Sequence, residues 1–343
     1  MGAALSLALC SHNNNNNDYR FTSQSKEQSL IRTRETYVDA YFETHHCAPK
    51  PFRDHVVLRK YDDERLEKGD LVALPNENNS AKGVLVIGDV HGCYDELEML
   101  LEKGVKENDD IPFEAIIFVG DLVNKGPESA RVIRKVRLTE GMFAVRGNHD
   151  DGAIAAAAGD WARRKKKKYS WVLEGEKLSA DHNAGENERT VLSDEDLIWM
   201  SNLPYTIRVP WLTLNVDSGT TSEIIIVHAG FVKDIEIEKQ QVCDMLTLRE
   251  LIEVDGKLQN TQKINDNSRG SDKSEANPWA QMWSGPEHVI FGHDARRGLQ
   301  LKKYATGLDS GCVYGGKLTG LILPQRRLIC VKAKKEYSRK GES

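Results

Sequence analysis

The sequence predicts an α/β fold, and three observations support this prediction. Five short runs of β-branched and aliphatic residues lie between residues 84 and 291, and their unbroken apolar character is typical of strands covered on both faces. Amphipathic stretches with helical spacing separate several of these runs. Each run is followed at once by a small polar turn, and the turns beyond the carboxyl ends of strands are where α/β proteins gather functional residues.

The expected elements follow in chain order. The predicted strands are Val84–Ile87, Ala115–Val119, Met142–Val145, Ile224–Val227 and Val289–Phe291. Two predicted helices, Tyr94–Lys103 and Glu128–Leu138, each place aliphatic residues on one face. A third, Ser193–Leu203, begins with Ser193 as an N-cap and has Asp196 three residues later.

Composition shifts divide the chain into a large domain with extensions. Residues 1–30 are expected to form a flexible leader, because this polar stretch cannot repay the entropy of ordering. Residues 31–81 are interpreted as an N-terminal extension and linker, punctuated by prolines. The main domain is predicted at 82–335, with flexible polar insertions near 174–189 and 255–277, and 336–343 is a tail.

Composition and charge exclude several classes of protein. The chain has 343 residues, 39% of them hydrophobic, which excludes a wholly disordered protein. Its 47 Lys and Arg against 52 Asp and Glu give a net charge of −5, which argues against a globally basic nucleic-acid coat. Six scattered cysteines without a Cys-x-x-Cys pair indicate a reducing compartment, so we expect a cytoplasmic protein. No apolar run approaches the roughly 18 residues that a transmembrane helix needs.

The N-terminus fits a lipidation pattern. Gly2 and Ser6 satisfy the form Met-Gly-x-x-x-Ser/Thr for N-myristoylation, and Cys10 is a candidate for palmitoylation. Two acyl chains would give stable anchoring to the cytosolic face of a membrane. The alternative is a frayed tail that happens to begin with Met-Gly, since the motif fixes only two positions.

Five strand-end turns carry candidate metal ligands. Each turn alone would be an ordinary surface turn, but turn propensity gives no reason for a histidine to recur in them. Nitrogen and oxygen donors of this mixture suit Mn, Zn, Fe, Co or Ni better than Ca or Mg. Six ligands fit two divalent metals that share a carboxylate, a centre able to clamp both oxygens of a phosphoryl transfer and to acidify a bridging water. The candidates are Asp89, His91, Asp121, Asn148, His228 and His293.

With these motifs, the sequence resembles the calcineurin-like metallophosphoesterases over roughly residues 84–331. The resemblance implies two mixed β-sheets packed as a sandwich, with helices outside and a dinuclear metal centre. It implies that Asp89 and His91 bind the first metal, that Asp121 is the bridging carboxylate, and that Asn148, His228 and His293 are the remaining ligands. His149 is similar to the family's general acid, which protonates the leaving oxygen. Lys125 and Arg146 stand where the related phosphoprotein phosphatases place two phosphate-binding arginines.

Several residues differ from the phosphoprotein phosphatase pattern, and these differences indicate which branch of the family the sequence resembles. Asn124 replaces the aspartate that orients the catalytic histidine; it is expected to accept a hydrogen bond but to support a protonated His149 less well. Lys125 offers a point charge in place of a bidentate fork, and Asp150 replaces a glutamate. The motifs Gly-Asp-Leu-Val-Asn-Lys-Gly, Gly-Asn-His-Asp and the segment Thr306–Gly316 resemble the ApaH-like phosphatases. Known members of that branch cleave dinucleoside polyphosphates, mRNA caps or inorganic polyphosphate.

The resemblance therefore implies hydrolysis of phosphoanhydride bonds through attack by a metal-bridging hydroxide, with a polyanionic substrate. One alternative is a phosphoserine or phosphothreonine protein phosphatase, and another is an inactive membrane-tethered scaffold. No obligate protein partner is implied.

Local basic residues oppose the negative net charge. The run at 163–168, flanked by aromatic residues, is either a solvated face or a track for polyphosphate, RNA or anionic lipid. Arg297, four residues beyond His293, is a candidate to touch a phosphate chain. Trp279 and Trp283 have helical spacing and are expected to pack, while the histidines outside the motifs, such as His55 and His288, are expected in solvent or packing roles.

Overall fold

The structure is a computed structural model that describes residues 53–60, 70–73, 82–158, 169–177, 189–217, 220–263 and 275–339. The predicted lipidation sites Gly2 and Cys10 and the basic run at 163–168 lie outside these ranges. Within the described ranges, no helix has both the length and the apolar character needed to cross a membrane.

A five-stranded sheet carries the first three predicted strands side by side. Its order is β17-β16-β3-β4-β5, in which β3, β4 and β5 are parallel and β16 runs antiparallel to β3. The predicted strands reappear nearly unchanged, because each is a buried apolar run. The strand bounds are β3 (Val84–Ile87), β4 (Ala115–Phe118), β5 (Met142–Ala144), β16 (Lys317–Leu323) and β17 (Arg327–Lys332).

A seven-stranded sheet has the order β14-β15-β13-β9-β8-β1-β2. Its strands are β1 (His55–Arg59), β2 (Leu71–Val72), β8 (Thr206–Asp217), β9 (Thr220–Val227), β13 (His288–Phe291), β14 (Gln300–Leu301) and β15 (Ala305–Gly307). The domain boundary predicted at residue 82 is wrong, because β1 belongs to this sheet. His55 pairs in register with Thr206, and its Nδ1 lies 2.8 Å from the Thr206 hydroxyl. The linker thus supplies a strand to the main domain.

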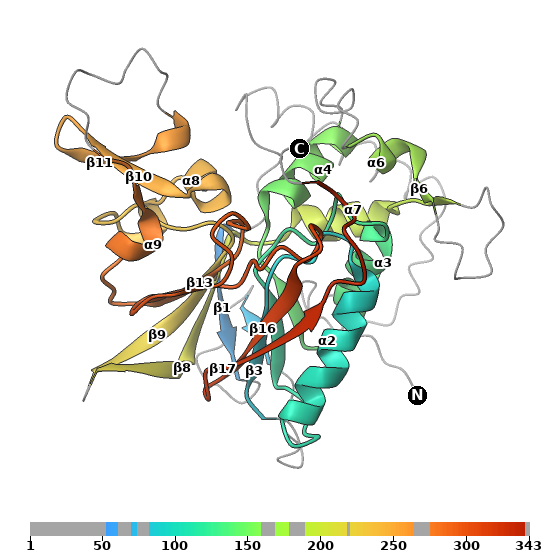
Figure 1. Ribbon diagram of the computed structural model, residues 1–343, viewed down its shortest axis with the longest axis horizontal. Helices are drawn as coiled ribbons and strands as arrows, with labels where there is room; N and C mark the ends of the chain where they lie inside the picture. Colours follow the sequence, from blue (N-terminus) through green and yellow to red (C-terminus); the bar gives the residue numbers. More distant parts are fainter. Residues whose placement is uncertain are drawn as a thin grey trace, which may run out of the picture.

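The two sheets pack face to face, as the resemblance implied. One buried apolar cluster draws on both sheets, including Val86 and Ile117 from one and Ile226 and Ile290 from the other. Helices cover the outer face of the five-stranded sheet, and α8 and α9 lie on the far side of the seven-stranded sheet (Figure 1). Trp279 and Trp283 pack there with a ring-centroid separation of 6.4 Å, as expected. The helices are α2 (Tyr94–Glu107), α3 (Ser129–Leu138), α4 (Asn148–Ala158), α6 (Trp171–Glu174), α7 (Asp194–Ser201), α8 (Val242–Thr247) and α9 (Trp279–Met282).

The predicted polar insertions hold more structure than expected. β6 (Glu176–Lys177) pairs with β7 (Arg189–Thr190), and a second small sheet joins β10 (Glu250–Val254) to β11 (Lys257–Asn260) and β12 (Asn277–Pro278). The buried Asn260 donates to Asp244, which fixes the second insertion to the domain. The predicted tail is also attached at its start, because the Tyr337 hydroxyl donates to Glu96 at 2.9 Å.

Candidate metal centre

The candidate ligands meet at one edge of the sandwich, at the carboxyl ends of five strands. Asp89 and His91 follow β3, and Asp121 follows β4. Asn148 begins α4 just after β5, while His228 and His293 follow β9 and β13. Parallel strands end at the same edge of a sheet, so residues 204 positions apart in sequence become neighbours there.

Side-chain contacts link five of the six candidates. Asp121 lies between two imidazoles, with Oδ2 at 3.4 Å from His91 Nε2 and Oδ1 at 3.4 Å from His228 Nε2. Asn148 Oδ1 lies 3.0 Å from His228 Nε2 and 2.9 Å from His293 Nδ1. Asp89 joins through the backbone, since both its oxygens accept the His293 N–H at 3.0–3.1 Å. The central position of Asp121 is the one that a bridging carboxylate needs.

Several residues of the site have strained backbone conformations. His91, Asp121 and His293 adopt φ of 49°, 51° and 68°, and Asn124 and Lys125 adopt 76° and 72°. L-residues populate this left-handed region rarely, and strained residues of this kind cluster at functional sites. Glycines make room beside them: a Cβ on Gly147 would overlap Asp121, and one on Gly292 would overlap the Asp89 carboxylate.

The positions of the protons on the histidine rings test whether metal ions fit this site. They leave lone pairs facing one another. His228 Nδ1 lies 2.8 Å from the Val119 carbonyl oxygen, so it must carry the proton and Nε2 presents a lone pair to Asn148 Oδ1. Two acceptors 3.0 Å apart repel each other unless a cation neutralises them. The buried Nε2 of His293 has no hydrogen-bond partner. Imidazole nitrogens and carboxylate oxygens converge here, and one of the nitrogens has no hydrogen-bond partner. Such a set of atoms fits divalent metal ions.

Burial and neighbouring charges both shift the pKa values of the candidate ligands. Burial, and then Lys125, lower the pKa of His91 to about 3, and burial also lowers the pKa values of His228 and His293. The three rings are therefore neutral, which is the form that binds a metal ion. Burial alone would raise the pKa of Asp121, but its neighbours, among them the positively charged Lys125, hold it below its usual value.

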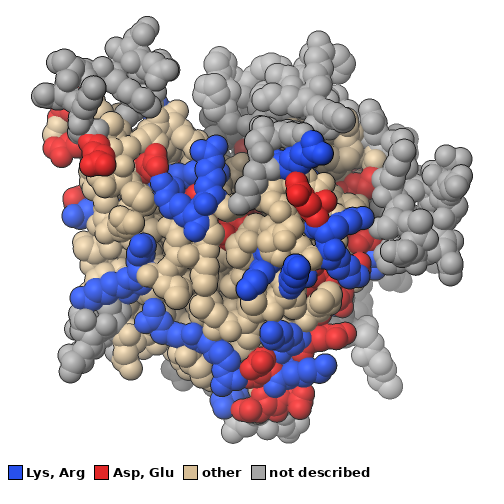
Figure 2. Space-filling model, in the orientation of Figure 1, with Lys and Arg blue, Asp and Glu red and all other residues tan. Residues whose placement is uncertain are grey.

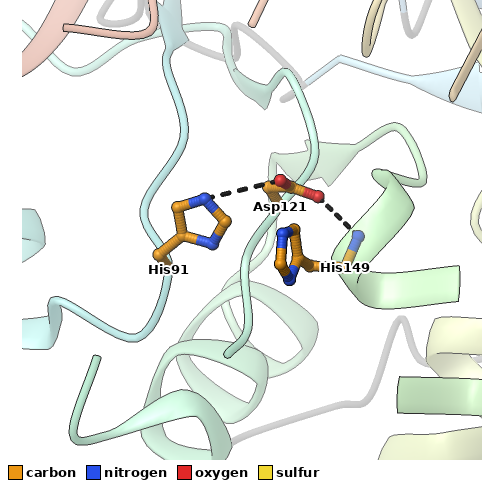
Figure 3. Close-up of side chains that lie close together, drawn as sticks. All are labelled: His91, Asp121 and His149. Atoms are coloured by element: carbon orange, nitrogen blue, oxygen red, sulfur yellow. Dashed lines mark hydrogen bonds and ion pairs between the residues drawn. The ribbon is translucent and has the colours of Figure 1, made fainter. Parts of the chain in front are cut away.

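His149 lies beside this cluster, and its hydrogen bonds assign the position of its proton. Its backbone N–H donates to Asp121 at 2.8 Å, and its ring meets the His91 ring edge-on at 4.9 Å (Figure 3). Asn124 Oδ1 accepts from Trp171 Nε1 at 3.2 Å and from a backbone N–H at 3.0 Å. The Asn124 amide N–H therefore points at His149 Nδ1, 2.7 Å away.

This arrangement corrects the expectation for Asn124. It donates to His149 Nδ1 where it was expected to accept, because two other donors occupy its oxygen. His149 Nδ1 is then an acceptor, and the ring proton sits on Nε2.

Of the three predicted phosphate-binding cations, Lys125 alone lies within the site. Its Nζ is 3.0 Å from His91 Nε2 and 5.2 Å from the Tyr314 ring centroid. Arg146 is fully buried and bonds to Asp151, the Ser201 carbonyl and the Tyr205 hydroxyl, so the prediction of a phosphate contact is wrong for it. Arg297 is held by Asp294 and Glu250, and these two carboxylates neutralise the charge that was expected to meet a phosphate chain.

Comparisons with known proteins agree with this geometry. Residues 83–297 match the family described as calcineurin-like phosphoesterase. The chain belongs to that family. It is a hydrolase, and the family implies divalent metal cofactors.

Relatives place it near the tetraphosphatases. The chain is 24% identical to the asymmetrical bis(5'-nucleosyl)-tetraphosphatase PrpE of Bacillus subtilis over 74% of its own length and 95% of the relative. It is 27% identical to PrpE of Bacillus cereus over 72% of its length and 92% of that protein. A crystal structure named for a diadenosine tetraphosphatase is 30% identical, with a TM-score of 0.54 over 82% of this chain and 99% of the other. These matches confirm the resemblance to ApaH-like phosphatases.

Two residues that lie at the candidate metal centre of this calcineurin-like phosphoesterase were not predicted from the sequence patterns. Arg249, between α8 and β10, donates to the His293 carbonyl at 3.2 Å, and burial lowers its pKa. Nothing local marks it, because it follows no strand-end motif. Asp309 follows β15 at the same edge, and burial raises its pKa to about 6. Its place directly after a buried strand was the available signal.

Proposed function

We propose that this protein hydrolyses phosphoanhydride bonds of dinucleoside polyphosphates, capped mRNA ends or inorganic polyphosphate with the help of two divalent metal ions. Its tetraphosphatase relatives support this reaction class. The site supports it further through its charges and through the position of one proton.

The proposed metal ligands are Asp89 and His91 for one ion and Asn148, His228 and His293 for the other, with Asp121 shared. Bound there, Mn, Zn, Fe, Co or Ni would polarise a phosphoryl group and acidify water. Backbone carbonyls at Val119 and Val123 hold the His228 and His91 rings with Nε2 directed inward. Such outer contacts fix ring orientation and raise the basicity of the ligand.

The donor position of Asn124 is the observation that carries the choice of substrate. Because Asn124 donates to Nδ1, the neutral His149 ring keeps a proton on Nε2, and protonation of Nδ1 would break the hydrogen bond from Asn124. A neutral imidazole is a weak acid. Hydrolysis of a phosphoserine expels a strongly basic alkoxide, whereas hydrolysis of a phosphoanhydride expels a phosphate that is stable as an anion. The site therefore suits phosphoanhydrides better than phosphoserine or phosphothreonine.

Lys125 and Arg249 supply positive charge for the substrate. Lys125 reaches the centre with its ammonium group. The Arg249 side chain, whose Nε lies 3.9 Å from Asp294 Oδ1, remains partly exposed beside the His293 turn. A polyphosphate carries several negative charges, so two cations at one site stabilise both its binding and the charge that develops during cleavage.

A substrate panel tests this function. Diadenosine tetraphosphate, capped RNA, polyphosphate and a phosphopeptide are compared with Mn, Zn, Co and Mg in turn, and His149→Ala serves as the control. We expect one or more phosphoanhydrides to be turned over in preference to the phosphopeptide. Preferential hydrolysis of the phosphopeptide would overturn the proposal.

A further inference from the structure

The hairpin formed by β16 and β17 begins and ends at the edge that carries the metal centre. β16 is antiparallel to β3, so its first residue, Lys317, lies where β3, β4 and β5 end. The strand pairing places Lys332, the last residue of β17, directly opposite Lys317. The turn of the same hairpin, with Arg326, lies at the opposite edge.

The two lysines form an uncompensated like-charge pair. Both are exposed, and like charges directly opposite one another across two strands destabilise a sheet. Within the described ranges neither lysine forms an ion pair with a carboxylate, whereas Arg327 pairs with Glu107 and Lys334 with Asp95. An anion bound beside these two strand ends would offset the repulsion between their charges.

A short loop connects the pair to the catalytic edge. The Lys317 N–H donates to the Ser310 carbonyl at 3.2 Å, next to the buried Asp309. Farther along the loop, the Tyr314 ring lies 5.2 Å from Lys125 Nζ. The start of β16 also touches the first motif, because the Gly88 N–H donates to the Thr319 carbonyl at 2.9 Å.

The C-terminal segment that contains β16 and β17 is basic although the whole chain is acidic. Residues 295–339 contain eleven Lys and Arg but only two Asp and Glu, against a net charge of −5 for the chain. Figure 2 shows many Lys and Arg side chains over the face that carries β16 and β17 in Figure 1, with Asp and Glu side chains among them. An excess of positive charge in one segment attracts polyanions.

We propose that Lys317 and Lys332 form an anion subsite, which binds phosphate groups of the substrate chain beyond the bond that is cleaved. The proposal rests on the proposed function and names the substrate class more closely, as a chain of phosphate groups long enough to extend from the metal centre to β16. Such a chain comes from either a single-stranded nucleic acid or inorganic polyphosphate.

The variant Lys317→Gln/Lys332→Gln tests the subsite against a matched control, Lys303→Gln/Arg326→Gln. The control removes the same charge from exposed positions at the opposite edge of the sandwich. Both are made in the His149→Ala chain, which keeps every candidate ligand. Binding of a labelled 5'-triphosphorylated ten-nucleotide RNA is measured by fluorescence anisotropy against salt concentration, with inorganic polyphosphate and unlabelled RNA as competitors.

We expect the subsite variant to bind the RNA at least about fivefold more weakly. The slope of log affinity against log salt should become shallower by about 1.4, because two phosphate contacts are lost and a single strand releases roughly 0.7 counterion per contact. The control should keep both the affinity and the slope. Its melting temperature and that of the subsite variant should not fall. Competition by either polyanion supports the subsite, and the better competitor identifies the source of the phosphate chain.

Two results would overturn the subsite: an unchanged affinity and slope in the subsite variant, or an equal loss in the control. Turnover separates this failure from failure of the proposed function. The same substitutions in the chain with His149 intact should lower kcat/KM for long polyphosphate but leave inorganic triphosphate unaffected. Absence of any phosphoanhydride hydrolysis would refute the proposed function. The binding measurements would still show whether Lys317 and Lys332 bind phosphate groups.

Discussion

The two halves of the metal centre offer opposite chemistry. In the acceptor half, formed by Asn148, His228 and His293, lone pairs converge and one buried nitrogen has no partner. In the donor half, formed by Asn124, Lys125 and His149, side-chain N–H groups already point at ring nitrogens. The first half needs added cations, while the second brings its own protons and positive charge to an anionic substrate. Asp121 touches both halves.

Asp121→Asn should have the largest effect, because it breaks the link between the halves. Loss of an outer contact to a ligand commonly weakens metal affinity by about 10–100-fold, and loss of a shared ligand should exceed this. We expect hydrolysis to fall by more than about 100-fold, with a lower metal content per chain by elemental analysis. Asp194→Asn, at an exposed position of α7, should change neither quantity. A fully metal-loaded and active Asp121→Asn variant would contradict the bridging role.

Asn124→Asp should alter the donor half more selectively. A carboxylate cannot donate to His149 Nδ1, so Nδ1 would take up a proton and the ring would become a stronger acid. General acid catalysis typically contributes about 10²–10⁴-fold, so we expect the ratio of phosphopeptide to phosphoanhydride kcat/KM to rise by about tenfold or more.

Asn124→Ala is the control for this ratio, because it removes the donor without adding a charge. It should lower activity without favouring the phosphopeptide. If Asn124→Asp folds, binds metal and keeps the parent ratio, the donor position of Asn124 does not set the choice of leaving group.

The acceptor half was largely predictable from sequence, and the donor half was not. Each candidate ligand in that half follows a buried apolar run, so periodicity and strand ends were enough to predict that these residues lie together. The direction of the Asn124 amide depends on Trp171, 47 residues away, which no local pattern connects to it.

Arg146 shows the converse failure. It stands directly before the Gly-Asn-His-Asp motif, yet Asp151 and Tyr205 hold it in the core. Its burial depends on tertiary contacts that a motif does not encode. β1 escaped for a similar reason: its five residues are interpretable as a strand only beside β8.

Glu176→Gln should change the pH dependence of stability on the donor side. Glu176 accepts the N–H groups of Ser129 and Ala130 at 2.9 and 3.1 Å, which holds the start of α3 behind the Lys125 turn. Burial raises its pKa from 4.5 to about 7. Between these values the folded chain binds more protons than the unfolded chain, so this group's contribution to stability is lost as pH rises. The variant should lose that slope in chelator-treated protein followed by thermal unfolding; parallel curves from pH 4.5 to 8 would refute the assignment.

His288→Gln should give an effect of similar size and opposite sign on the acceptor side. His288 begins β13, the strand that ends at the His293 turn, and its Nε2 lies 2.9 Å from the Thr306 hydroxyl. Burial, and then Arg326, lower its pKa from 6.5 to about 4. The unfolded chain binds more protons in this window, so wild-type stability should fall as pH decreases from about 6.5 to 4.

Gln keeps a polar group near Thr306 but does not titrate, so His288→Gln should flatten this loss in the same melting series. Arg326→Gln provides the internal check: without the second cause of the shift, the pKa of His288 rises toward 6.5 and the acid loss should become smaller. A His288→Gln curve parallel to that of the wild type would assign the acid sensitivity to the neutral ligand histidines instead. In that case Glu176 and His288 would not have opposite effects on the pH dependence of stability.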